Sequence, residues 1–218
     1  MSVYLKKNII PLGIEIIFII SCFIVPRDYY IYTNFVFYSV LLIYFIAVKD
    51  FSIKEWGSNL KKGKTFWKSV WVTAFFFMLA FAITMILENV FPYLETGTIG
   101  LRRSNGFELF LFALSTIILP PIVEEIFFRK GLIALENNTI MTITLVFSMF
   151  LYAAEHALSL WGIFLTMIWA FPLSISFIKT KNVYIPMTAH FIINFIGNGS
   201  EILFTIARLL QRFFEVNY

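Results

Sequence analysis

Seven apolar segments follow one another along this chain, and each is about as long as a helix that crosses a lipid bilayer, roughly 20 residues. They cover residues 9–25, 29–48, 69–87, 107–135, 139–156, 157–178 and 183–200. Apolar residues make up 60% of the 218 residues and charged residues only 14%, which is more apolar surface than a soluble domain of this size can bury. The sequence therefore predicts an all-α protein, a polytopic transmembrane helical bundle with about seven or eight membrane helices.

The tail and the first apolar segment are both interpreted as parts of the same membrane domain. The tail at 202–214 is interrupted by Arg208 and Arg212, so it is either an eighth short span or an interfacial amphipathic helix. The first apolar segment follows Lys6 and Lys7 and lacks a small-residue cleavage motif, which indicates a retained span. The single cysteine, Cys22, excludes an internal disulfide and a zinc site built on thiolates. We expect a single integral membrane domain over 1–218, with a catalytic core at about 107–200.

The basic residues indicate an orientation in the membrane. A net charge of +4 could suggest nucleic acid in a soluble protein, but here Lys and Arg cluster in short connections between apolar segments. We therefore expect the lipid bilayer as a partner and no nucleic acid. With a cytoplasmic N-terminus, twelve basic residues lie toward the cytoplasm and five lie opposite. The twelve are Lys6, Lys7, Lys49, Lys54, Lys61, Lys62, Lys64, Lys68, Arg129, Lys130, Lys179 and Lys181, and the five are Arg27, Arg102, Arg103, Arg208 and Arg212.

Two adjacent glutamates, Glu124 and Glu125, lie inside the fourth apolar segment. Carboxylates at that depth must face protein or a water-filled cavity, and they often mark function. The i, i+4 spacing of Glu125 and Arg129 predicts an ion pair on one helix face. Glu124 points about 100° away and has no cation nearby in the sequence. Glu124 is therefore the candidate general base, and Glu125 the candidate supporting residue.

Two prolines, Pro120 and Pro121, precede these glutamates and remove two backbone donors from the helix. They predict a kink or break in the fourth segment. We expect the glutamates to begin a fresh helical turn, whose free amides could hold an anion or a polarised water.

The chain has two histidines, and each has a partner one helical turn away. Tyr152 and His156 share one face of the fifth segment, and His190 and Asn194 share one face of the seventh. If these faces converge on Glu124, the site has a base, an imidazole that orients the same water, and two hydrogen-bond donors for an oxyanion. These groups suffice to add water to a peptide carbonyl. We expect this reaction near the cytoplasmic side of the membrane.

The order of these residues resembles that of a known family. Glu124-Glu125-x-x-x-Arg129, Tyr152-x-x-x-His156 and His190-x-x-x-Asn194, on successive membrane segments, resemble the motifs of the CAAX protease and bacteriocin-processing (CPBP, or Abi) family of intramembrane endopeptidases. The resemblance covers about 115–198, and Tyr152 stands where the family usually has phenylalanine. It implies that Glu124 and His156 activate a water and that His190 and Asn194 form the oxyanion site, with Glu125, Arg129 and Tyr152 in support.

The family includes eukaryotic enzymes that trim prenylated CAAX proteins and bacterial members associated with bacteriocin immunity and peptide maturation. A composition rich in Phe, Ile and Lys is typical of a low-GC bacterium. We therefore expect a membrane-associated peptide or protein as the substrate, in a bacterial cytoplasmic membrane, in place of a prenylated one. The sequence predicts no particular oligomeric state.

Alternative interpretations remain open for the polar residues. Glu124, His156 and His190 could form a His₂Glu zinc site, although the spacing is not HExxH and the resemblance favours a glutamate-activated water with no metal cofactor. A second class is a catalytically silent membrane scaffold or immunity protein. In that case Glu125 and Arg129 form a compensated ion pair and His156 lies at the membrane interface. His190 and Asn194 then form hydrogen bonds between helices. A third class is a transporter whose Glu and His residues relay protons.

Overall fold

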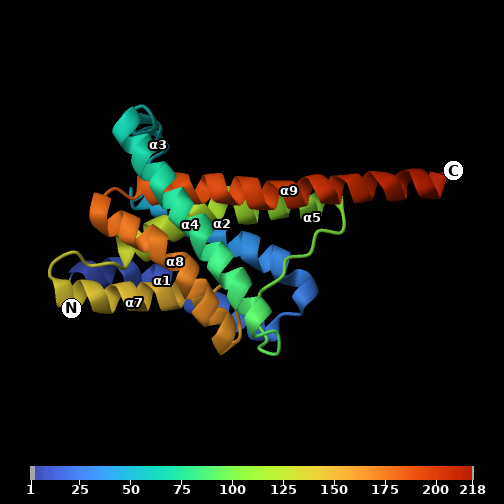
Figure 1. Ribbon diagram of the computed structural model, residues 1–218, viewed down its shortest axis with the longest axis horizontal. Helices are drawn as coiled ribbons and strands as arrows, with labels where there is room; N and C mark the ends of the chain where they lie inside the picture. The colour runs from blue at the N-terminus through green and yellow to red at the C-terminus, as the bar shows by residue number, and fades with distance from the viewer. Residues whose placement is uncertain (1–2, 218) are drawn as a thin grey trace.

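The computed structural model describes residues 3–217, and the side chains of 8–211, as a bundle of helices without a strand in that range (Figure 1). The all-α prediction is confirmed. The helices are α1 (Val3–Ile24), η1 (Arg27–Tyr29), α2 (Tyr30–Ala47), α3 (Ile53–Leu60), α4 (Lys64–Val90), α5 (Gly106–Ala113), η2 (Leu114–Ile118), α6 (Leu119–Glu124), η3 (Glu125–Gly131), α7 (Asn138–Ala154), α8 (Leu160–Thr180) and α9 (Tyr184–Asn217). The elements from α5 to η3 follow without interruption and form one central helix, Gly106–Gly131.

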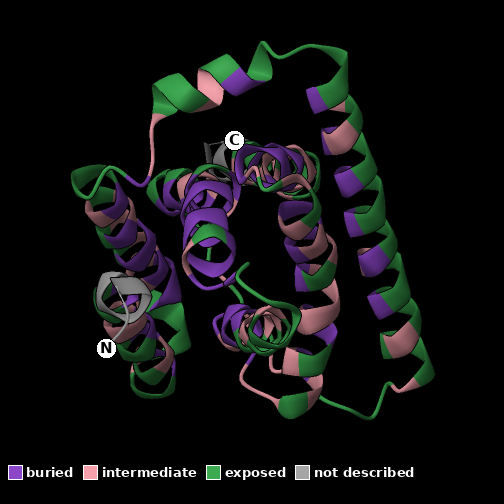
Figure 2. Cartoon of the chain, turned by 90° about the vertical axis from the view of Figure 1, so that its left-hand side faces the viewer, coloured by how far each residue is buried: buried purple, intermediate pink, exposed green. Residues whose placement is uncertain are grey.

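Within the described part of the chain, four helices are long and apolar enough to cross a membrane: Arg27–Ala47, Lys64–Val90, the central helix and Leu160–Thr180. Asn8–Ile24 and Asn138–Ala154 are shorter apolar helices. Buried residues lie on the sides where helices face one another, and the outer sides are exposed (Figure 2). The central helix is the most enclosed, with 61% of its apolar window buried against 33–39% in the other three. Residues at the middle of the central helix are therefore surrounded by the rest of the bundle.

Side-chain caps explain where several helices begin. α3, α5, α7 and α8 each follow a Ser or Asn whose side chain accepts a hydrogen bond from the backbone N–H three residues later. The caps are Ser52, Asn105, Asn137 and Ser159. The cap at Ser159 separates α8 from α7, so a turn at 155–159 divides the fifth and sixth apolar segments. His156 lies in this turn and not on a helix face.

The tail does not form a separate span. α9 runs from Tyr184 to Asn217 as one helix, so residues 202–214 continue the seventh apolar segment (Figure 1). Of the two interpretations, neither a separate eighth span nor an independent interfacial helix is formed. The short helix α3, in the connection between the second and third segments, was not expected from the apolar pattern because it holds few apolar residues.

Pro120 and Pro121 were predicted to kink or break the fourth segment, and no break forms there. The helix continues through them, with wider π turns at Leu114–Ile118 and Glu125–Gly131, and the amide of Leu119 donates to the carbonyl of Leu114. The amide of Glu125 donates to the carbonyl of Ile122, so the expected set of free amides at the glutamates is not formed. A π turn shifts the hydrogen-bond register by one residue, which accommodates prolines inside a continuous helix.

An extended connection between α4 and α5 lies against the turn that carries His156. Thr98 and Ala157 form an antiparallel bridge, in which the amide of Ile99 donates to the carbonyl of His156 at 3.0 Å. Two glycines allow this close approach. Gly97 has a φ of +57°, and a Cβ on Gly162 would lie 1.8 Å from the carbonyl oxygen of Thr96. The connection therefore holds the turn after α7 in place.

Candidate functional site

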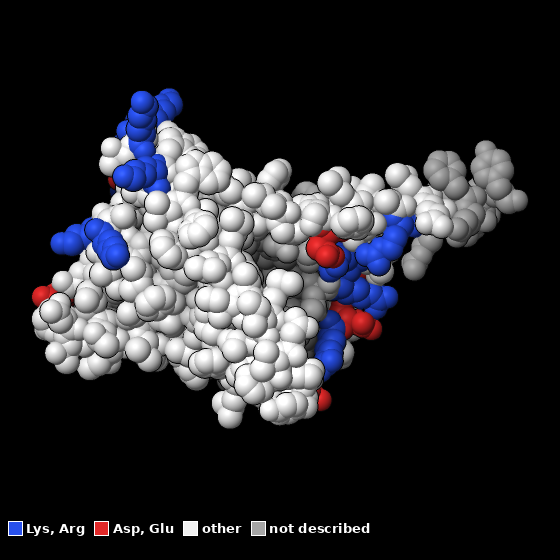
Figure 3. All heavy atoms as spheres, in the orientation of Figure 1, with Lys and Arg blue, Asp and Glu red and all other residues white. Residues whose placement is uncertain are grey.

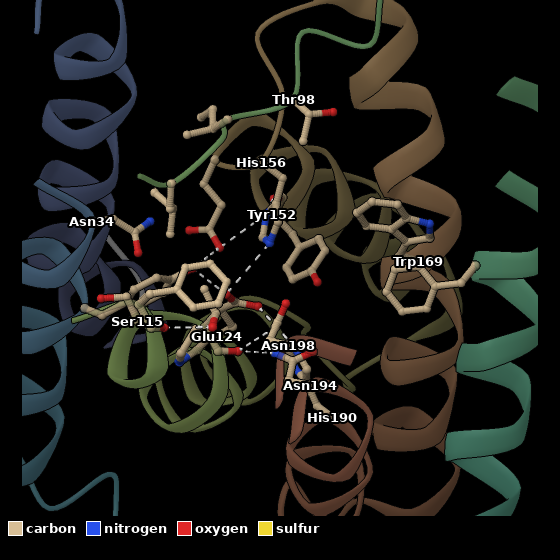
Figure 4. Close-up of a pocket in the computed structure, with 18 of the residues that line it drawn as sticks. Asn34, Thr98, Ser115, Glu124, Tyr152, His156, Trp169, His190, Asn194 and Asn198 are labelled. Atoms are coloured by element: carbon tan, nitrogen blue, oxygen red, sulfur yellow. Dashed lines mark hydrogen bonds and ion pairs between the residues drawn. The ribbon is translucent and has the colours of Figure 1, made fainter. Parts of the chain in front are cut away.

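A cavity of about 330 Å³ lies inside the bundle, and five residues of the sequence motifs lie at its wall (Figure 4). Glu124 lies on the central helix, Tyr152 near the end of α7, His156 in the turn after α7, and His190 and Asn194 on α9. The three motifs that were expected to converge therefore do so, with His156 projecting from a turn and not from a helix face. Aromatic side chains from α4, α5 and α8 complete the wall: Phe77, Phe81, Phe112 and Trp169.

Glu124 is 1% exposed and is the group that links the two imidazoles. Its Oε1 lies 4.0 Å from Nε2 of His156, and its Oε2 lies 3.9 Å from Nε2 of His190. Both separations are too long for a direct hydrogen bond and suit one bridging water. The carboxylate is thus placed to accept a proton from a water that also contacts an imidazole.

Glu125 points the other way and joins two cationic or cation-forming groups. Its Oε2 lies 3.3 Å from Nε of Arg129, which is the ion pair expected from the i, i+4 spacing. Its Oε1 lies 3.0 Å from Nδ1 of His190. Glu125 and Arg129 are fully buried, so this carboxylate compensates the arginine and fixes the orientation of the His190 ring.

His156 is oriented by Tyr152 through both backbone and ring contacts. Nδ1 of His156 lies 2.8 Å from the carbonyl oxygen of Tyr152, which assigns the ring proton to Nδ1 and leaves Nε2 as an acceptor facing Glu124. The two rings lie 4.5 Å apart and are tilted by 30°. The guanidinium of Arg129 lies over the same tyrosine ring, 4.6 Å from its centroid. An aromatic residue at position 152 therefore connects the first motif to the second.

Asn194 is fixed by the central helix, and the prolines explain how. The carbonyl of Thr116 lies four residues before Pro120 and five before Pro121, neither of which has an N–H to donate. The side-chain amide of Asn194 donates to this carbonyl at 2.8 Å, and that of Asn198 at 3.3 Å. One of the two N–H groups of Asn194 is thus used, and the other remains for a ligand in the cavity.

Two residues at the site were not identified from the sequence. The hydroxyl of Tyr38 on α2 lies 2.5 Å from Oε1 of Glu124 and 3.2 Å from Oε1 of Glu155. Glu155 is 4% exposed, and its Oε1 also lies 3.6 Å from Nδ1 of His156. Glu15 on α1 is fully buried beside Glu155. The one available sequence signal was the position of Glu155, directly before the histidine of the second motif.

The residues that could hold a metal ion differ from the His₂Glu set considered from the sequence. Among the described residues, one group of His, Cys, Asp or Glu has ligand atoms close enough together: Glu124, Glu155 and His156, all within 4.8 Å. His190 is not a member, since its Nδ1 is held by Glu125 and its Nε2 faces the other oxygen of Glu124.

The cavity lies toward the end of the bundle formed by the 91–105 connection and the 155–159 turn. α3 and the lysine-rich connections form the opposite end (Figure 3). If the N-terminus is cytoplasmic, the cavity belongs to the extracytoplasmic half of the membrane. The expectation of a site near the cytoplasmic side stays a prediction: Glu124 lies seven residues from Gly131, at the lysine-rich end of the central helix, whereas the cavity extends toward the other end.

Residues 106–196 match the family model described as Type II CAAX prenyl endopeptidase Rce1-like. The match confirms the family resemblance. It covers the central helix, α7, α8 and the part of α9 that carries His190 and Asn194. No curated protein and no solved structure matches the chain. The family match and the apolar helices together support an integral membrane protein, and the matched Rce1-like family implies a CAAX-type intramembrane protease.

Proposed function

We propose that this Rce1-like protein is an intramembrane endopeptidase that hydrolyses a peptide bond of a membrane-associated peptide or protein with a glutamate-activated water. The observation that carries the proposal is the position of Glu124, whose two carboxylate oxygens lie 4.0 and 3.9 Å from two imidazole nitrogens. A water that bridges Glu124 and His156 would be held by a base and an acceptor at once, while the gap to His190 places a donor beside the same carboxylate. Such an arrangement is the one that general-base hydrolysis needs.

The reaction would proceed in two proton transfers. Glu124 takes a proton from the water while Nε2 of His156 orients it, and the resulting hydroxide attacks the carbonyl carbon of the substrate. His190 and the free N–H of Asn194 stabilise the oxyanion; Glu125 compensates a charged His190. The C–N bond then breaks as Glu124 returns its proton to the leaving nitrogen, which gives one carboxylic acid and one amine; these exchange a proton to form the carboxylate and the ammonium.

The proposal is metal-free, and a zinc-dependent version is the second candidate. The zinc version is supported by the grouping of Glu124, Glu155 and His156. The metal-free version is supported by Tyr38, whose hydroxyl donates a hydrogen bond to Oε1 of Glu124, one of the three candidate ligands. We place the protein in a bacterial cytoplasmic membrane with its N-terminus inside, with peptide maturation or bacteriocin immunity as its setting.

A membrane-proteome comparison tests the proposal. Membranes of cells with the wild-type protein and with Glu124→Gln would be compared for new N-termini by chemical labelling and mass spectrometry. We expect uncut precursors in the Glu124→Gln cells, and the same precursors to be cut by purified wild-type protein in proteoliposomes. Asn89→Asp is a matched control, since Asn89 lies at the exposed end of α4, and it should cut normally. Full cleavage by purified Glu124→Gln would refute the proposal, and normal immunity or signalling without any cleavage would favour the scaffold alternative.

A further inference from the structure

The two ends of the bundle differ in their basic residues. All eleven lysines lie at or near the end formed by the N-terminus of α1, α3, and the connections at 48–63, 131–137 and 181–183. At the other end the basic residues are arginines, and two of them are paired: Arg102 lies 3.1 Å from Asp28, and Arg103 contacts Glu201. Figure 3 shows the two groups of charge separated on this face by a surface without charged residues. An excess of basic residues in short connections marks the cytoplasmic end of a membrane protein.

The cavity reaches the surface at the arginine end. Thr98 is exposed and lines the cavity together with Ile99 and Leu101, all from the connection between α4 and α5. In Figure 4, Thr98 lies on the far side of His156 from Glu124 and His190. The bridge between Thr98 and Ala157 fixes this rim beside the imidazole. A ligand that enters past Thr98 therefore meets His156 first.

The cavity is closed toward the lysine end. Between Glu124 and the lysine end, the central helix and α9 contribute Phe127, Arg129 and Met187. Each of these side chains is 0% exposed. Phe127 and Arg129 belong to the π turn of the central helix, and Met187 lies one turn before His190. A packed layer of this kind leaves no room for a peptide chain.

From these observations we infer that substrates reach Glu124 from the extracytoplasmic side, past the rim at Thr98. This inference rests on the proposed function and names its substrate class. The protein cuts exported peptides or the extracytoplasmic ends of membrane segments, and it does not cut the cytosolic C-termini that prenylation marks.

Cysteine labelling tests the orientation without a substrate. Tyr93→Cys places a thiol on the 91–105 connection, where Tyr93 is 74% exposed and outside the cavity wall, and Ser58→Cys places one on exposed α3. The native Cys22 is 4% exposed, so the wild-type protein is a low-background control. We expect a membrane-impermeant maleimide to label Tyr93→Cys in intact cells and Ser58→Cys only after permeabilisation. The reverse pattern would overturn the inference.

Blocking the rim tests access itself. Thr98→Cys would be labelled in intact cells with a bulky impermeant maleimide, and precursors would be compared before and after labelling in the same cells. We expect loss of processing and the precursors seen with Glu124→Gln, whereas labelled Tyr93→Cys continues to process them. Unchanged processing after complete labelling of Thr98→Cys would overturn the inference. Absence of any precursor in Glu124→Gln cells would instead refute the proposed function, while the labelling pattern still decides the orientation.

Discussion

The hydroxyl of Tyr38 donates a hydrogen bond of 2.5 Å to Oε1 of Glu124, across 86 positions of the chain. This bond joins α2, which lies outside the segment matched by the family model, to the candidate base. The same hydroxyl lies 3.2 Å from Glu155. The tyrosine thus fixes the rotamer of Glu124 and separates two buried carboxyl groups.

Tyr38→Phe should slow peptide hydrolysis by about 10- to 100-fold, because a hydrogen bond to a charged group contributes about 1.5–3 kcal/mol. The phenylalanine ring fits the same space, so the protein should still insert and fold. The measurement is the initial rate of precursor cleavage in proteoliposomes. Tyr30→Phe is the matched control, since Tyr30 is also buried on α2 but donates to the carbonyl of Cys22. Equal rates for the two variants would contradict a role for Tyr38.

Arg129→Met should destabilise the protein by about 3–5 kcal/mol, because removal of one partner leaves the buried Glu125 carboxylate uncompensated. The loss should appear as a lower free energy of unfolding in detergent micelles titrated with a denaturing detergent. Lys130→Met is the neighbouring control. Its side chain is 38% exposed and its ammonium group lies 3.4 Å from Asp50, so its loss should change stability by less than about 1 kcal/mol. Similar losses in the free energy of unfolding for both variants would contradict the larger contribution expected from the buried pair of Glu125 and Arg129.

The bond between Asn194 and Thr116 predicts a non-additive pair of substitutions. Asn194→Ala should destabilise the protein by about 1–3 kcal/mol, because the buried carbonyl of Thr116 loses its nearer donor. Pro120→Ala restores a backbone N–H that can bond this carbonyl within the helix. The double variant should therefore lose less stability than the sum of the two single variants. Its cleavage rate should stay as low as that of Asn194→Ala, since the free N–H facing the cavity is still missing.

Additive stability losses would contradict the explanation that the prolines free this carbonyl. Recovery of cleavage in the double variant would show that Asn194 has a structural role and does not stabilise the oxyanion. The two readouts thus separate the positional role of the asparagine from its proposed chemical role.

The sequence predicted the features that depend on local spacing. Segment length and apolarity predicted the helical bundle, and the i, i+4 spacing predicted the ion pair of Glu125 and Arg129. The order of the motifs gave the convergence of Glu124, His156 and His190. These features follow from helix geometry, which repeats along any chain.

Contacts between distant segments could not be predicted in this way. Tyr38 is one of ten tyrosines in an apolar sequence, and no spacing marks which one faces Glu124. The prolines were expected to break the helix because their missing donors are visible in the sequence, whereas the donors on α9 that replace them are not. The side on which the cavity opens depends on the position of each residue along its helix, which the motif order does not contain.

The metal-free proposal predicts that chelators do not inhibit cleavage. Incubation with 1,10-phenanthroline followed by removal of the chelator should leave the rate unchanged, and metal analysis of the purified active protein should find no stoichiometric zinc. Glu155→Gln is informative in the same assay, since it removes one of the three candidate ligands. The zinc-dependent version would be established instead if the chelator removed the activity, zinc restored it, and Glu155→Gln abolished it.

The close approach of the 91–105 connection to α8 predicts an effect at a residue with no functional side chain. Gly162→Ala should destabilise the protein by about 1–3 kcal/mol, because the new methyl group would lie 1.8 Å from the carbonyl oxygen of Thr96 and 2.7 Å from Cβ of Ala157. The displacement would pass to the bridge between Thr98 and Ala157 and so to His156. Cleavage should therefore fall together with the free energy of unfolding. Gly197→Ala on α9 is the control, since a Cβ there meets nothing within 4 Å, and it should leave cleavage intact. Normal cleavage by Gly162→Ala would mean that the turn carrying His156 keeps its position without the connection packed against it.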